Sequence, residues 1–177
     1  MPAAHAATAP APDPPGDTAT PDPPEPPPGA GVVAPGASYA WPLLPPPAVL
    51  TAFDEPDFRF GRGHRGVDLA GTPGQPVLAA ADGVVVHAGV LAGRGVVSVL
   101  HADGLRTTYE PVTAAVTAGA AVRRGIVLGT LDAGHPGCPG ACLHWGVRRD
   151  RWDYLDPLVL LRPPHVRLLP TPEPWPL

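Results

Sequence analysis

Short apolar runs separated by polar turn residues recur through the middle of the chain. The main runs cover Val77–Ala81, Val84–Ala88, Val96–Leu100, Leu105–Tyr109, Ile126–Leu131 and Leu143–Val147. No stretch repeats apolar residues with the 3.6-residue period of an amphipathic helix over ten residues. Many short strands at close spacing are typical of all-β architectures. The pattern therefore predicts an all-β fold, a barrel-like sandwich.

Two Asp-Gly pairs mark turns between these runs. Asp82-Gly83 precedes the run at Val84, and Asp103-Gly104 lies between Val96–Leu100 and Leu105–Tyr109. Two strands around an Asp-Gly pair give the strongest short-range signal for a β-hairpin. We therefore expect a hairpin around Asp103-Gly104.

Proline divides the chain into three parts. Of the 29 Pro residues, sixteen lie in residues 1–47 and six in residues 163–177. The first tract has no hydrophobic periodicity and cannot bury enough apolar surface to offset its chain entropy. We expect a disordered Pro/Ala-rich arm over residues 1–40, one folded domain over residues 41–161, and a Pro-rich tail over residues 162–177.

Charge and hydropathy exclude some classes of function. The net charge is −4, and the basic residues, which are all Arg, do not cluster, so the chain lacks the electrostatic signature of nucleic-acid binding. The exclusive use of Arg indicates the coding bias of a GC-rich genome. No apolar run is long enough to span a bilayer. No signal-peptide core is visible. The segment His5–Pro10 nevertheless has the composition typical of residues just after an export cleavage site, so we expect an extracytoplasmic protein, secreted or in the cell envelope.

Two polar motifs interrupt the apolar pattern. His64 and Asp68 lie four residues apart, which in an extended segment places them on the same face. His144 lies on a predicted strand whose other positions are apolar. Imidazole nitrogens and carboxylate oxygens are both good zinc ligands. Taken singly, each motif has an alternative explanation without a metal. His64 and Asp68 would then form a hydrogen-bonded pair, and His144 would be a core histidine whose ring nitrogens are hydrogen-bonded.

The order of the motifs carries more information than each motif alone. The segment GHRGVDLA comes first, the Asp82-Gly83 turn and the strand ending at Tyr109 come next, and LHWGV comes last. This ordered set resembles the lysostaphin-like (LytM-type) zinc metalloendopeptidases, peptidoglycan DD-metallopeptidases of the duplicated hybrid motif type, over residues 41–161. The resemblance implies an antiparallel fold with a groove over the zinc site and a substrate among peptidoglycan peptides. It also implies one Zn²⁺ ion held by His64, Asp68 and His144.

The chain departs from the family pattern at two catalytic positions and looks like an actinobacterial variant in which two histidines are replaced. The histidine of the family's YxHL-type segment falls on Pro111, and the first histidine of its HxH motif falls on Cys142. Losing one general acid or base typically lowers the rate by about 10²–10⁴. Glu110 is the nearest carboxylate and a weak candidate base, because strand alternation points it to the face opposite residue 111.

Three states are open for Cys142, whose sulfur should lie on the same strand face as His144. It can ligate zinc as a thiolate and close the site, remain a free thiol, or form a disulfide with Cys138. The intervening Pro139-Gly140-Ala141 can fold tightly enough for a disulfide. Export from the cytoplasm would also favour that bond.

Other polar residues receive supporting roles. His101 precedes the Asp103-Gly104 turn, and we expect it to support the hairpin, together with Tyr109. His135 precedes a proline, and we expect it to be a solvated loop residue.

These residues support two hypotheses of different classes. The first is a zinc metalloendopeptidase directed at peptidoglycan cross-links, with an atypical and slow site. The second is a catalytically inactive zinc-binding wall module or a regulator of another cell wall hydrolase, suggested by Pro111 and Cys142. The sequence leaves open the bond that is cleaved and the oligomeric state.

Overall fold

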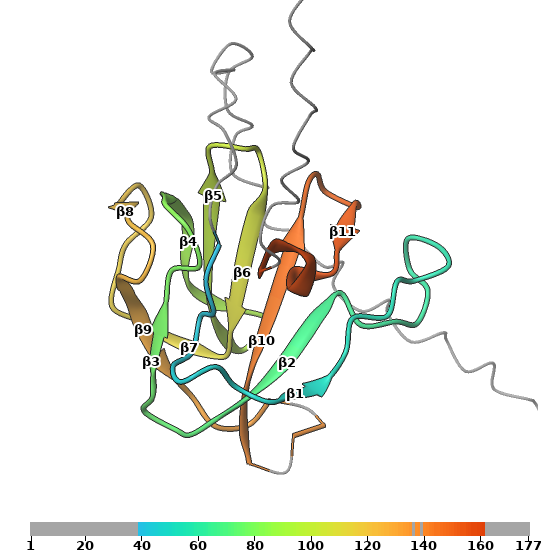
Figure 1. The fold of residues 1–177 in the computed structure, drawn as a ribbon, viewed down its shortest axis with the longest axis horizontal. Coiled ribbons are helices and arrows are strands. Elements are labelled where there is room, and N and C mark those ends of the chain that lie inside the picture. The colour runs from blue at the N-terminus through green and yellow to red at the C-terminus, as the bar shows by residue number, and fades with distance from the viewer. Residues whose placement is uncertain (1–38, 136, 139, 162–177) are drawn as a thin grey trace, which may run out of the picture.

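Strands make up nearly all of the regular secondary structure in the computed structural model (Figure 1). The structure describes residues 39–135, 137–138 and 140–161. The elements in chain order are β1 (Val49–Thr51), β2 (Gly66–Gly71), β3 (Pro76–Leu78), β4 (Gly83–Leu91), β5 (Arg94–His101), β6 (Arg106–Glu110), β7 (Val112–Ala114), β8 (Ala121–Val122), β9 (Val127–Leu131), β10 (Ala141–Arg148), β11 (Tyr154–Leu155) and the short 3₁₀ helix η1 (Pro157–Leu161). The prediction of an all-β fold is confirmed.

The expected arm and tail lie outside the described ranges, apart from Tyr39 and Ala40. The ring of Tyr39 is buried in the core, and the Ala40 N–H donates to the Ala80 carbonyl oxygen at 2.8 Å. Packing therefore begins at Tyr39 at the latest. In the part of the chain that the structure describes, no helix combines the length and apolar character that a membrane span requires.

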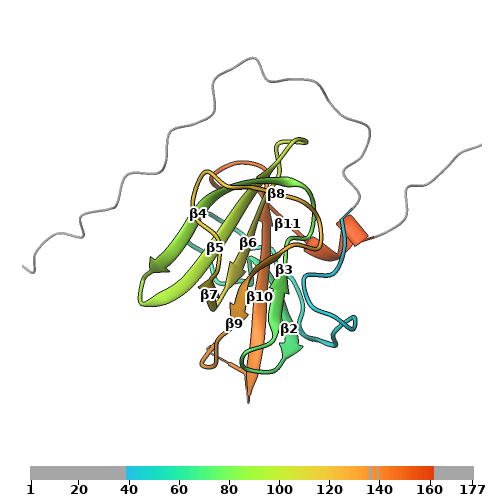
Figure 2. The same cartoon turned by 90° about the vertical axis from the view of Figure 1, so that its left-hand side faces the viewer.

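The strands form two antiparallel sheets. The larger has eight strands in the order β1-β2-β10-β6-β5-β4-β8, with β11 paired to β10, and the smaller has the order β3-β9-β7. No pairing among the described residues joins β1 to β8, so the larger sheet stays open and the fold is a sandwich rather than a closed barrel. Figure 2 shows β7 and β9 beside the larger sheet.

One hydrophobic core joins the two sheets. Leu143 and Trp145 of β10 and Val97 of β5 contribute fully buried side chains from the larger sheet. Val77 of β3 and Leu128 of β9 contribute theirs from the smaller sheet. Burial of apolar area at about 25 cal/mol per Å² is the main stabilising term for such a core.

The turns show where local sequence signals hold and where they do not. Asp103-Gly104 joins β5 to β6, as predicted. Asp82-Gly83 instead marks the passage of the chain from β3 in the smaller sheet to β4 in the larger one. The tightest hairpin uses Ala92-Gly93 between Leu91 and Arg94, with φ values of 50° and 78°. Two successive positive φ values match the type I′ turn that suits twisted two-stranded ribbons.

Alternation along the central strands sorts side chains onto two faces. On β10, Leu143, Trp145 and Val147 face the core. Asp68 on β2, His144 on β10 and Glu110 on β6 lie opposite one another in the strand register. Directly opposed residues share a face of the sheet. We call this side of the larger sheet, carrying Asp68, His144 and Glu110, the polar face.

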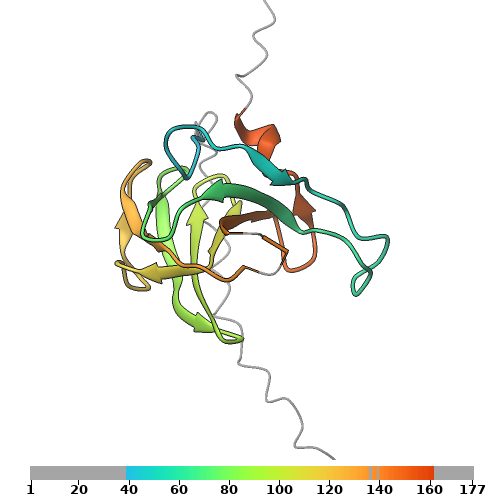
Figure 3. The ribbon, with the colours of Figure 1, turned by 90° about the horizontal axis from the view of Figure 1, so that it is seen from below.

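The segment between β1 and β2 supplies one more residue to this region. Figure 3 shows the segment projecting away from both sheets before it returns to β2. At its base Asp54 and His64 pair as an isolated bridge, with backbone hydrogen bonds of 2.7 and 3.0 Å. The bridge fixes the backbone of His64 two residues before β2 begins.

Candidate metal centre

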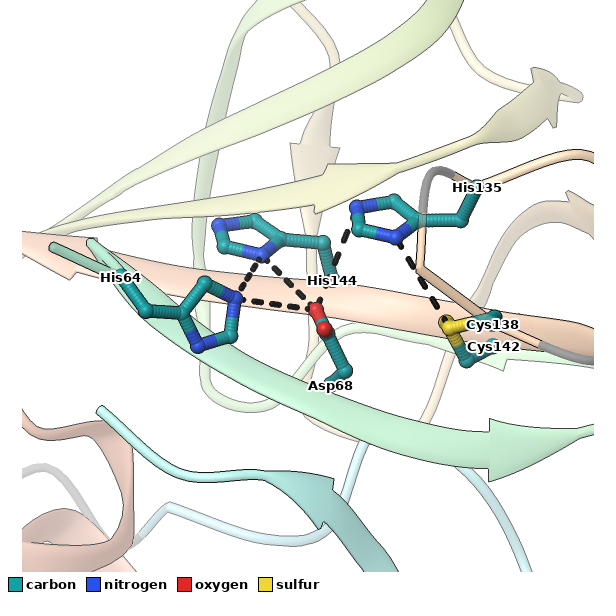
Figure 4. The surroundings of a disulfide bond; sticks show 6 residues. All are labelled: His64, Asp68, His135, Cys138, Cys142 and His144. Atoms are coloured by element: carbon teal, nitrogen blue, oxygen red, sulfur yellow. Dashed lines mark hydrogen bonds and ion pairs between the residues drawn. A yellow bond between two sulfur atoms is a disulfide. The ribbon is translucent and has the colours of Figure 1, made fainter. Parts of the chain in front are cut away.

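Three side chains meet at the β2–β10 pair. His64 Nε2 lies 3.1 Å from Asp68 Oδ1 and 3.0 Å from His144 Nδ1. His144 Nδ1 lies 3.1 Å from Asp68 Oδ1, so the three atoms form a nearly equilateral triangle (Figure 4). The side chains are 20%, 6% and 14% exposed in the order His64, Asp68, His144. The triangle is thus mostly shielded from solvent, and both imidazoles keep partial exposure.

A backbone carbonyl sets the tautomer of His64. Its Nδ1 is 2.8 Å from the carbonyl oxygen of Ala52, which can only accept a hydrogen bond. Nδ1 therefore carries the proton, and the lone pair of Nε2 points into the triangle. A hydrogen bond of this kind from the second ring nitrogen is the usual way in which proteins orient a metal-binding imidazole.

The electrostatics of the triangle favour a cation. Burial opposes the charge on Asp68, but the hydrogen bond from His144 and the nearby His64 outweigh it, so the pKa of Asp68 lies below its usual value. Asp68 is therefore a carboxylate at neutral pH. With His64 in the tautomer above, a neutral His144 can supply at most one proton to three electron-rich atoms. A metal ion would satisfy all three.

The donor set fits zinc. Zinc binds imidazole nitrogen and carboxylate oxygen at about 2.0–2.2 Å, so ligand atoms in a tetrahedral site are roughly 3.3 Å apart. The observed separations of 3.0–3.1 Å need only small side-chain adjustments to reach that value. Three protein ligands leave the fourth position open, which is the usual arrangement of a catalytic rather than a structural zinc site.

Gly66 makes room for His144. A Cβ atom added at residue 66 would lie 2.7 Å from His144 Nε2 and 2.6 Å from the carbonyl oxygen of Trp145. Real side chains do not tolerate such contacts, so only glycine lets the His144 ring occupy its position over β2. Gly66 lies within β2 and provides space for a neighbouring ring.

His135 also lies beside the triangle, and the prediction that it is a solvated loop residue is wrong. Its side chain is only 10% exposed, and its Nε2 is 3.9 Å from Asp68 Oδ1. Its ring stacks on that of His144, with centroids 5.6 Å apart and planes within 5° of parallel. A third imidazole therefore faces the candidate metal position, from the loop between β9 and β10 (Figure 4).

Glu110 is closer to the site than strand alternation suggested. It lies directly opposite His144 in the β6–β10 register and so shares the polar face, whereas we expected it to point away. Its Oε2 is 3.7 Å from Arg94 Nε, an ion pair that holds the carboxylate toward β5. Pro111 is buried, and its carbonyl oxygen accepts a hydrogen bond from the Asp132 N–H at 3.0 Å.

Cys138 and Cys142 form a disulfide. Cys142 is fully buried on β10, and Cys138 belongs to the loop that carries His135. His135 Nδ1 is 3.8 Å from Cys138 Sγ, so the bond ties the loop, and His135 with it, to the strand that carries His144. In the disulfide neither sulfur is available as a thiolate ligand.

His101 and Tyr109 belong to a separate, buried hydrogen-bond network. His101 Nδ1 is 2.8 Å from the Asp82 carbonyl oxygen, and its Nε2 is 2.7 Å from Thr107 Oγ1. Thr107 Oγ1 is 2.9 Å from the Tyr109 hydroxyl, which also accepts from the Ala80 N–H at 3.0 Å. Burial raises the pKa of Tyr109 to about 12 and lowers that of His101. These contacts join β5 and β6 to the segment before β4.

Comparison with protein families identifies a family for most of the described residues. The model of "Peptidase family M23" matches residues 62–157, which include all residues of the triangle and both cysteines.

Among curated proteins, the chain is similar to the uncharacterized protein Rv2891 of Mycobacterium tuberculosis. The two are 55% identical over 137 residues, covering 73% of this chain and 54% of the relative. The DD-carboxypeptidase/endopeptidase Mpg of Neisseria meningitidis is 39% identical over 71 residues, covering 40% of this chain and 16% of the relative. The chain spans about half the length of the mycobacterial relative.

Solved structures share the fold. Helicobacter pylori Csd3 superimposes with a TM-score of 0.61 at 27% identity, covering 76% of this chain and 38% of the other. The catalytic domain of lysostaphin from Staphylococcus simulans gives a TM-score of 0.56 at 22% identity, covering 65% and 92%. A chain of the SpoIIQ-SpoIIIAH pore forming complex gives 0.57 at 27% identity, covering 71% and 91%.

Proposed function

Because this chain belongs to peptidase family M23, we propose that it is a zinc-dependent endopeptidase that cleaves peptide bonds in peptidoglycan. The observation that carries the proposal is the triangle of His64 Nε2, Asp68 Oδ1 and His144 Nδ1, with separations of 3.0–3.1 Å and partial exposure of both imidazoles. In this proposal one Zn²⁺ ion is held by these three residues.

The chain's own residues define how such a site would work. A zinc ion bound there would lower the pKa of a bound water to about 7 and polarise a substrate carbonyl. Ala52 keeps the lone pair of His64 directed at the metal position, and Gly66 keeps His144 within reach. The low pKa of Asp68 keeps its carboxylate in the ligating form at neutral pH.

His135 is the side chain that we assign to proton handling in this reaction. The resemblance places histidines at residues 111 and 142, where this chain has proline and a disulfide-bonded cysteine. His135 brings an imidazole to the same region from a loop, 3.9 Å from Asp68 Oδ1. Glu110 is the second candidate, and its ion pair with Arg94 holds the carboxylate toward β5.

The substrate class and location are part of the proposal. Support for peptidoglycan comes from similarity to a DD-carboxypeptidase/endopeptidase over 71 residues and from the fold shared with lysostaphin, an antimicrobial peptidase. The Cys138–Cys142 bond supports an oxidising compartment, such as the cell envelope or the medium.

The test is digestion of peptidoglycan by the purified, disulfide-bonded chain with one equivalent of zinc. Mass spectrometry should find soluble fragments with new amino termini. A chelator or the His64→Ala substitution should abolish them. The matched control is His87→Ala on β4, three strands from β10 in the sheet order, which should leave release unchanged. Fragments that appear equally with His64→Ala would refute the proposed activity.

A second candidate function is a non-catalytic wall module or a regulator of another cell wall hydrolase. Pro111 and Cys142 favour it, and one solved neighbour belongs to a pore forming complex. This candidate predicts that the protein sediments with insoluble peptidoglycan but releases no fragments with or without zinc. The digestion experiment therefore separates the two candidates.

A further inference from the structure

A second group of ligand-type atoms adjoins the triangle. It consists of the Asp68 carboxylate, the His135 imidazole and the sulfurs of Cys138 and Cys142, whose atoms all lie within 4.8 Å of one another. Figure 4 shows His135 between the disulfide and Asp68. Its Nδ1 faces Cys138 Sγ at 3.8 Å and its Nε2 faces Asp68 Oδ1 at 3.9 Å.

The chemistry of this group depends on the oxidation state of the two cysteines. In the disulfide the sulfurs are bonded to each other and cannot act as thiolates. A dithiol reductant would transfer two electrons and two protons, breaking the S–S bond, releasing two Cys thiols and becoming a disulfide itself. Two thiols, one imidazole and one carboxylate would then face one another.

We infer that reduction of Cys138–Cys142 creates a second zinc site, made of Cys138, Cys142, His135 and Asp68. Thiolate and imidazole are preferred zinc ligands, and binding releases the two thiol protons. Zn–S bonds of about 2.3 Å need sulfurs roughly 3.8 Å apart in a tetrahedral site. Cys142 is fixed on β10, so Cys138 would make the adjustment.

The second site would have all four zinc coordination positions filled by protein, whereas the first leaves one position open. It has four protein ligands and no position for water, the usual arrangement of a structural zinc site. Soft thiolates bind zinc well, so a reduced protein should hold the ion there in preference to the His64 triangle. Asp68 belongs to both sets, so an ion in the second set withdraws one ligand from the first.

The oxidation state of the disulfide, which we call the latch, therefore decides which set of ligands holds the metal. When it is intact, zinc has only the open triangle, and His135 lies beside the ion without ligating it. When it is reduced, the ion and His135 are both drawn into the closed set. This role of the latch depends on the proposed peptidase function, whereas the existence of the second site does not.

The test uses Co²⁺ as a spectroscopic substitute for zinc in the full chain. One sample stays oxidised; another is reduced with a dithiol, freed of it by gel filtration without oxygen, and checked for native circular dichroism. The reduced sample should show a thiolate-to-cobalt charge-transfer band in the near ultraviolet. The oxidised sample should bind Co²⁺ without that band.

Two substitutions separate the sites. His64→Ala should abolish binding by the oxidised protein and leave the charge-transfer band of the reduced protein in place. His135→Ala should leave oxidised binding unchanged and weaken binding by the reduced protein by about tenfold or more. Cys138→Ser should reduce the band in proportion to the lost thiolate.

The outcomes also separate this inference from the proposed function. A folded, reduced protein without the band, or a band equally strong in His135→Ala, would overturn the second site. If the oxidised protein binds no Co²⁺ while the reduced protein shows the band, the second site stands and the proposed peptidase function fails. If only the oxidised protein binds Co²⁺, the second site is refuted and the metal site of the proposed peptidase stands.

Discussion

Two polar clusters in the larger sheet each contain histidine, and they differ in how their protons are distributed. In the His101 network each polar group has a hydrogen-bond partner within the protein: the Ala80 N–H and the Thr107 hydroxyl reach the Tyr109 hydroxyl, and the His101 imidazole lies between Thr107 Oγ1 and the Asp82 carbonyl. In the triangle of His64, Asp68 and His144, three ligand-type atoms lie 3.0–3.1 Å apart, and neutral imidazoles place at most one proton among them.

The difference separates structural histidines from metal-binding ones. A buried polar network is stable when every member is satisfied. The His101 network meets that condition without any ligand. In the triangle the Nδ1–H of His64 is directed outward to Ala52, so His64 Nε2 presents a lone pair to Asp68 and His144 that a bound cation would satisfy. The count of donors against acceptors, rather than the presence of histidine, therefore indicates where a metal binds.

The largest expected difference between the clusters concerns metal affinity. His144→Ala removes one ligand of the triangle, and we expect zinc affinity of the oxidised protein to fall by more than about 10²-fold, since even outer-shell changes cost about 10–100-fold. His101→Ala should leave the affinity unchanged. Competition with a chromophoric chelator measures both. Equal losses of zinc affinity in the two variants would contradict the distinction between a metal-binding triangle and a structural His101 network.

The next effect tests the part of His135 in the reaction. His135→Ala should lower the rate of peptidoglycan cleavage by about 10²–10⁴, the usual cost of a lost general acid or base. Zinc affinity of the oxidised protein should not change. Glu110→Gln, its comparison on the polar face, should lower the rate much less. A larger loss of cleavage rate in Glu110→Gln than in His135→Ala would indicate that Glu110, not His135, is the general acid or base.

A smaller effect on affinity is expected from Gly66→Ala. The added methyl group displaces the His144 ring, and we expect zinc affinity to drop by about 10–100-fold, as for other residues that orient a ligand. Gly140→Ala is the matched control, because a Cβ atom there meets no atom within 4 Å. If both variants bind zinc like the parent chain, His144 has more freedom than the structure shows.

Substitution of Tyr109 tests the satisfied network. Tyr109→Phe leaves the Ala80 N–H and Thr107 without one partner, and we expect the free energy of unfolding to fall by about 1–3 kcal/mol. Zinc affinity should stay the same. Chemical denaturation of the metal-free protein measures the first quantity. A variant that keeps its stability but loses zinc would place Tyr109 in the metal site.

The pH dependence of stability distinguishes the clusters in the metal-free protein. Burial lowers the pKa of His101 from 6.5, so the unfolded chain binds more protons and stability falls as pH drops from about 6.5 toward the folded-state pKa. The pKa of Asp68 is lowered from 3.8, so its contribution is lost only at more acidic pH. His101→Gln should flatten the slope between about pH 7 and 5, and Asp68→Asn should not. Denaturation midpoints across pH measure this.

Parts of this account were accessible from sequence because they depend on local pattern. Alternation and turn residues predicted β3, β4, β5, β6, β9 and β10 and the β5–β6 hairpin, but not the other strands. The order of the motifs along the chain brought His64, Asp68 and His144 into one hypothesis, and the structure places their ligand atoms together. Whether they bind zinc remains a prediction.

Other parts depend on packing between distant segments. The β4–β5 turn uses Ala92-Gly93, which lacks the usual Asn or Asp, and Gly66 is required by a ring 78 residues further along the chain. His135 was missed because its loop was considered alone. A signal was present: His135 lies three residues before Cys138, and a bond from Cys138 to Cys142 places it beside His144.

We expect His64, Asp68 and His144 to bind one zinc ion with a fourth coordination position left open. Crystals of the oxidised protein grown with one equivalent of zinc, with data collected on both sides of the zinc absorption edge, test it directly. We predict one anomalous peak at about 2.0–2.2 Å from His64 Nε2, Asp68 Oδ1 and His144 Nδ1, with no fourth protein ligand. A peak elsewhere, or an ordered triangle without a peak, would contradict the claim.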